Sequence, residues 1–119
     1  MTIFFDIPIR PAPDVLNQPR VQTNQWRLFR YEDHIFLMCQ RVGASTIRVT
    51  TPIQSMDPTT MTLETGSGRV YELLGPPCDC PEFLAAVQLN LGFSQLQGVT
   101  DVSLKIYADM KIHMDHSHA

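Results

Sequence analysis

Two of the three cysteines stand one residue apart, in the segment Cys78-Asp79-Cys80. Prolines at positions 76, 77 and 81 bracket the pair, and helical spacing of apolar residues begins directly after it. The positive end of the helix dipole favours the thiolate form of a cysteine at a helix N-terminus. A reactive or metal-binding pair is therefore one interpretation. A structural zinc site usually takes four ligands from paired spacings, however, and this segment offers only two. We expect the pair mainly to start the helix.

Three histidines stand close together near the C-terminal end, at His113, His116 and His118. Imidazole is the commonest metal-ligating side chain, and such tracts bind copper or nickel. Together with Cys78 and Cys80 they define the alternative function, a metal- or redox-responsive protein. A site in a terminal tail lacks the surrounding groups that orient metal ligands, so the prediction is that the protein uses no metal and no cofactor.

Nucleophilic catalysis would need a cysteine beside a histidine, and His34 is the only histidine before the C-terminal tract. It follows Glu32 and Asp33, which indicate a turn. Cys39 lies in a continuous apolar run, so we expect it to be buried, whereas reactive cysteines are partly exposed. Without a nucleophile, a base and an orienting group in one pattern, the chain is predicted not to be an enzyme.

Two arginines and three aromatic residues stand close together in the segment from position 26 to position 31. Residues 1–50 hold six arginines and no lysine against four carboxylates, a net charge of +2, and the rest of the chain has a net charge of −5. Arginine and aromatic residues are enriched at protein interfaces. The predicted binding surface consists of Trp26, Arg27, Arg30, Tyr31 and Arg48. The basic residues are not concentrated enough to predict nucleic-acid binding.

The elements that must position these residues begin with short strands. Residues 10–24 hold three prolines and predict an irregular arm. Five strand-like segments follow, at 26–31, 34–42, 44–53, 61–65 and 69–74, with the second as the central strand, covered on both faces. Turns are expected at Glu32-Asp33, at Asp57-Pro58 and at Gly66–Gly68. This spacing is typical of an antiparallel meander.

Helical spacing replaces the alternation after Pro77. Phe83, Leu84, Val87 and Leu91 recur on one helix face, with Pro81 in the first turn and Gly92 as a natural end. Residues 102–113 fit a strand by alternation, or a helix capped by Ser103, and we favour the helix.

The fold class that follows is α+β: a small antiparallel sheet of about five strands, with one or two C-terminal helices packed on one face. Residues 1–113 are expected to form a single domain and residues 114–119 a flexible tail.

The start of the chain does not resemble a signal peptide, and no apolar run is long enough to cross a membrane. Three cysteines, an odd number, indicate a reducing cytoplasm. The function predicted from these features is that of a small protein-binding module, such as an inhibitor or adaptor encoded by a phage or mobile element, whose partner is another protein.

Overall fold

A mixed β-sheet forms the centre of the structure. The structure is a computed structural model that describes residues 19–44, 46–94 and 98–117. The strands are β1 (Arg20–Tyr31), β2 (His34–Arg41), β3 (Arg48–Val49), β4 (Ile53–Asp57), β5 (Thr62–Thr65), β6 (Val70–Leu73) and β7 (Thr100–Asp101). The helices are α1 (Pro81–Ser94) and α2 (Ser103–Ser117). Within this part of the chain the strand order is β3-β2-β1-β6-β5-β4, and β7 also pairs with β1.

The antiparallel meander expected from the sequence is wrong in one respect that shapes the whole sheet. β1 pairs with β6 in parallel, through residues 20–23, and pairs with β2 in antiparallel orientation through its later residues. One long strand thus takes different partners along its two halves. A register shift between Thr23 and Gln25 separates the halves, and the Thr23 hydroxyl donates to the Gln40 carbonyl at 2.7 Å. The described residues form seven strands instead of the five predicted, because β4 and β7 were not expected.

The predicted irregular arm is shorter than the range 10–24, because β1 already begins at Arg20. Val21 and Thr23 are buried and alternate with the exposed Gln22 and Asn24, which is a strand pattern. Residues 10–18 of the arm lie outside the described part of the chain. The segment expected as one strand over 44–53 also divides: only Arg48–Val49 pairs with β2, and β4 starts beyond Pro52.

The predicted turns are confirmed. Glu32 adopts a positive φ of 55° between β1 and β2, and Gly68 adopts 89° between β5 and β6. After β4 the Asp57 carboxylate accepts a hydrogen bond from the Thr59 amide at 3.0 Å, so Asp57 stabilises the turn that Pro58 begins.

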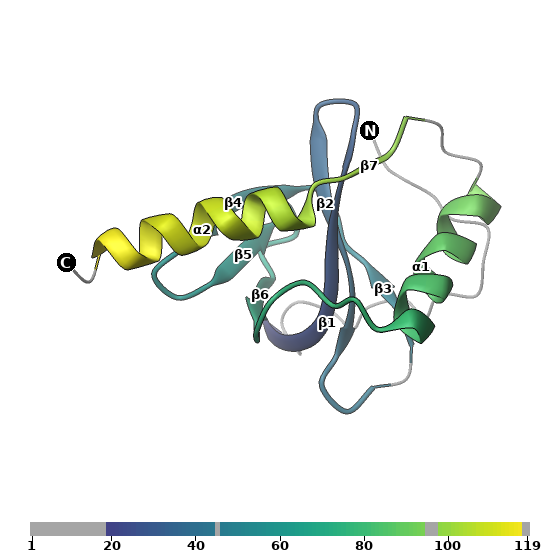
Figure 1. Ribbon diagram of the computed structural model, residues 1–119, viewed down its shortest axis with the longest axis horizontal. Helices are drawn as coiled ribbons and strands as arrows, with labels where there is room; N and C mark the ends of the chain where they lie inside the picture. Colours follow the sequence, from purple (N-terminus) through teal and green to yellow (C-terminus); the bar gives the residue numbers. More distant parts are fainter. Residues whose placement is uncertain (1–18, 45, 95–97, 118–119) are drawn as a thin grey trace.

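The two helices cover opposite faces of the sheet, which corrects the prediction that both pack on one face (Figure 1). Successive residues of a strand point to opposite faces, and β1 and β2 are buried on both. One face carries the first core cluster, which includes Trp26, Leu28, Leu37 and Cys39 and extends to Met110 of α2. The other carries Phe29, Phe36 and Met38, which pack with Phe83 and Val87 of α1. Cys39 is fully buried in β2, as expected.

Both C-terminal helices form where helical spacing predicts them, but their ends differ from the prediction. The Leu84 amide donates to the Cys80 carbonyl at 2.9 Å, which makes Cys80 the N-cap residue of α1, in agreement with the expectation that the cysteine pair starts the helix. The helix continues past Gly92 to Ser94. α2 continues to Ser117, beyond residue 113, where the flexible tail was expected to begin. Among the described residues no helix is long and apolar enough to span a membrane.

Candidate functional site

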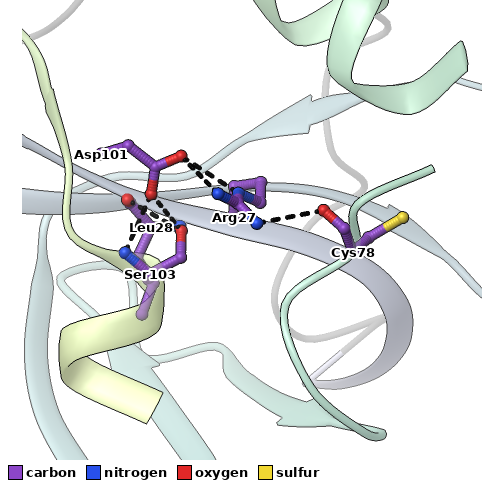
Figure 2. Close-up of polar contacts among 5 residues, drawn as sticks. All are labelled: Arg27, Leu28, Cys78, Asp101 and Ser103. Atoms are coloured by element: carbon purple, nitrogen blue, oxygen red, sulfur yellow. Dashed lines mark hydrogen bonds and ion pairs between the residues drawn. The ribbon is translucent and has the colours of Figure 1, made fainter. Parts of the chain in front are cut away.

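Arg27, the first arginine of the predicted surface, forms a network that holds three segments of the chain together (Figure 2). Its Nη2 and Nε lie 2.9 Å and 3.0 Å from Oδ2 of Asp101, which follows from β7 pairing with β1. Its Nη1 donates to the Cys78 carbonyl at 3.2 Å. The Arg27 side chain is only 14% exposed. These contacts tie β1 to β7 and to the segment before α1, so this guanidinium stabilises the fold.

Asp101 extends the same network to the start of α2. Its Oδ1 accepts hydrogen bonds from the Ser103 amide at 2.9 Å and from the Ser103 hydroxyl at 2.6 Å. The Ser103 hydroxyl in turn accepts a hydrogen bond from the Leu28 amide at 2.7 Å. Ser103 was expected to cap α2, but the Ile106 amide donates to the Val102 carbonyl, so Val102 occupies the N-cap position. The Asp101 side chain satisfies the first free amide of the helix.

The other residues of the predicted surface do not form one patch. Trp26 is fully buried, and its indole N–H donates to the Gly75 carbonyl at 3.3 Å, so Trp26 belongs to the core and not to a surface. Arg30 is exposed, whereas Tyr31 is half-buried against the α1-side cluster. Arg48 is half-buried on the short β3 and is paired in register with Cys39, on the face opposite to that of Tyr31. Because neighbouring strand residues point to opposite faces, this alternating sequence divides between two faces.

Among the residues that the structure describes, Cys39 is a buried core residue whose thiol has a shifted pKa, and Arg48 lies beside it. Burial raises the pKa of the Cys39 thiol to about 12, and the nearby Arg48 and a hydrogen bond with Thr23 oppose this effect only in part. The Arg48 Nη1 atom is buried and has no hydrogen-bond partner among the residues that the structure describes. A thiol with so high a pKa stays protonated and cannot act as a nucleophile near neutral pH.

Cys78 and Cys80 are both free and half-buried at the start of α1. The Cys80 amide donates to the Cys78 sulfur at 3.3 Å, and the Cys78 amide donates to the Trp26 carbonyl at 3.1 Å. Cys80 also lines a shallow groove of about 320 Å³ between α1 and the sheet, with Gln25, Gln40 and Phe83 among its walls. These contacts give Cys78 a role in the local backbone arrangement.

The metal-binding alternative finds no site in the described part of the chain, where no group of three or more histidine, cysteine or carboxylate side chains is placed to hold an ion. His113 is exposed on α2, far in sequence from the cysteine pair. The side chains of His116 and His118 lie outside the described residues. Metal binding by the histidines of this tract therefore stays a prediction.

The outward face of α2 is the feature that the sequence interpretation missed. Ser103, Ile106, Tyr107 and Met110 turn toward the sheet, where Met110 is buried in the first core cluster. On the opposite side Leu104 and Ile112 are 67% and 54% exposed, and Ala108 between them is exposed as well. We call Leu104, Ala108 and Ile112 the apolar stripe. Residues four apart lie on one helix face, so the three side chains form a continuous row.

The signal for the apolar stripe was present in the i, i+4 and i+8 spacing of residues 104, 108 and 112. The alternation of Val102, Leu104 and Ile106 also fitted a strand with all three residues on one face, and the spacing was used only to favour a helix. Val102 and Ile106 are indeed half-buried against the core, whereas Leu104 points away from it. Both faces of this helix therefore carry apolar side chains.

Comparison of the chain with known protein families, with curated proteins and with solved structures found no match.

Proposed function

We propose that this chain is a small non-catalytic protein-binding module, and that it binds through the apolar stripe of α2. The single observation that carries this proposal is the exposure of Leu104 and Ile112 on the helix side that faces away from the sheet. Exposed large apolar side chains are common one at a time, but a continuous row of them on a regular element is typical of an interaction site.

The partner that fits such a row is an amphipathic helix. A helix face of two larger apolar side chains flanking Ala108 offers close approach at the centre and apolar contact on either side. Lys105 and Asp109 stand exposed in the next row and would give polar contacts at the rim.

Binding of this kind needs no cofactor. The free thiols of Cys39, Cys78 and Cys80 support a reducing cytoplasm as the place where the module acts, and an inhibitor or adaptor role is consistent with these properties.

Site-specific photocrosslinking tests the proposal. A benzophenone amino acid replaces Leu104 or Ile112, and as a matched control it replaces Leu89, which is 59% exposed on α1. We expect the first two positions to give adducts of the same mass with one protein, and position 89 to give none. The proposal is contradicted when positions 104 and 112 give no adduct, or when the control position gives the same one.

A further inference from the structure

Two charged residues of opposite sign lie along one side of the apolar stripe. Lys105 and Asp109 are four residues apart, so they lie in one row next to the stripe, and both are exposed. The structure shows no ion pair for either side chain among the residues it describes. Lysine before an acidic residue at this spacing is the less favourable order for a pair within one helix. Both charges are therefore available to a partner.

We propose that the partner of α2 is α2 of a second copy of this chain, packed antiparallel about a twofold axis. This inference rests on the proposed function and identifies its partner. In an antiparallel pair related by a twofold axis, each flank of the helix faces the same flank of the other copy, running in the opposite direction. Lys105 then faces Asp109 of the second copy, and Asp109 faces Lys105 of the second copy.

The same register also matches the apolar side chains. When Lys105 lies opposite Asp109 of the second copy, Leu104 lies between Ala108 and Ile112 of that copy. A small residue at the centre lets the two backbones approach closely, and the larger side chains then fill the space on either side. One register thus satisfies the charged row and the apolar row together. A surface with this property is complementary to itself, as a twofold interface requires.

The expected dimer is weak. Stable interfaces bury about 800 Å² on each partner, and a contact of about three helical turns buries less than that. We therefore expect association in the range of about 10 μM to 1 mM, the low end of specific complexes. Low salt strengthens it, since exposed charge pairs are screened at higher ionic strength.

Charge-swap variants test this pairing directly by sedimentation velocity. Lys105→Asp leaves two negative charges in the row, and Asp109→Lys leaves two positive charges, so each variant repels its own copy. We expect each alone to associate about tenfold or more weakly than the unmodified chain. An equal mixture of the two should restore association, because each Asp now faces a Lys. Gln88→Asp and Gln88→Lys in α1 add the same charges at an exposed position and serve as controls without effect.

The mixture is the decisive sample. Restored association in the mixture, with none in the separate variants, supports the antiparallel pair. The inference is overturned when the separate variants associate like the unmodified chain, when the mixture stays as weak as its components, or when the unmodified chain is monomeric up to about 1 mM. Adducts of positions 104 and 112 with a different protein would then leave the proposed function intact, and the absence of any adduct would remove both.

Discussion

Nη2 of Arg27 lies 2.9 Å from Oδ2 of Asp101, and this ion pair joins β1 to the residue that caps the start of α2. Asp101 also accepts a hydrogen bond from the Ser103 amide, so the pair helps to anchor the start of α2, the helix that carries the apolar stripe, against β1. Arg27 had been expected to contact a partner, but its contacts give it a structural role.

Replacing Arg27 with Ala should destabilise the fold by about 1–2 kcal/mol. The change removes the ion pair and leaves the Cys78 carbonyl without a hydrogen bond; the ion-pair part is modest because the Asp101 side chain is 37% exposed. Arg30→Ala is the control, since Arg30 is exposed, and should change the free energy of unfolding by less than about 0.5 kcal/mol. Urea denaturation followed by circular dichroism measures both. Equal losses in the two variants would show that the Arg27 network adds no stability.

Ser103→Ala should also destabilise the protein, by about 1–3 kcal/mol. Ser103 is fully buried, and its hydroxyl oxygen is the acceptor for the Leu28 amide, which would lose that bond inside the core. Ser55→Ala on β4 is an exposed control and should have little effect. The same denaturation measurement applies. A variant of Ser103 as stable as the control would mean that Leu28 finds another acceptor.

Cys39 should make the stability of the protein fall as pH rises above about 9. The thiol pKa is 9.0 when unfolded and about 12 when folded, so above pH 9 the unfolded state loses the proton while the folded state keeps it. The folded state is then disfavoured by roughly 1.4 kcal/mol per pH unit until the folded thiol also ionises. Cys39→Ala removes this contribution, and its free energy of unfolding should fall less steeply between pH 9 and pH 11. Parallel pH profiles of the two proteins would contradict the burial of Cys39.

Changing Cys78 and Cys80 together to Ser should preserve both the fold and self-association. A serine hydroxyl at position 78 can accept the Cys80 amide in place of sulfur, and serine is a favourable N-cap residue at position 80. We expect a change of less than about 1 kcal/mol in the free energy of unfolding and an unchanged association constant. Calorimetric unfolding and sedimentation check the two parts. Loss of association in this variant alone would move the binding site to the start of α1.

Local patterns predicted the elements of this fold better than their arrangement. The alternation from Trp26 to Tyr31, the turn at Glu32 and the helix from Pro81 were all recognisable because each depends on neighbouring residues. The parallel pairing of β1 with β6 joins residues about 50 positions apart, and no local pattern records it. The opposite placement of α1 and α2 is likewise long-range, because it depends on which face of β1 and β2 each helix covers.

The candidate site could be predicted only in part for a related reason. Arg27 and Trp26 look like interface residues in sequence, but each has its polar atoms satisfied within the chain by Asp101, Cys78 or Gly75. Which arginine or aromatic residue remains free depends on such long-range contacts. The apolar stripe of α2 has a local spacing, yet its exposure depends on which side of the helix the sheet covers.

The mass of the protein in solution as its concentration rises tests the central claim, that the outward face of α2 is the surface through which this chain associates. Sedimentation equilibrium compares the unmodified chain with Leu104→Glu and with Leu89→Glu, which alters a similarly exposed leucine on α1. We expect the average mass of the unmodified chain and of Leu89→Glu to rise from 13.5 kDa toward twice that value as the concentration approaches about 1 mM, while Leu104→Glu stays at 13.5 kDa. A mass of 13.5 kDa for all three proteins, or the same rise for all three, would contradict it.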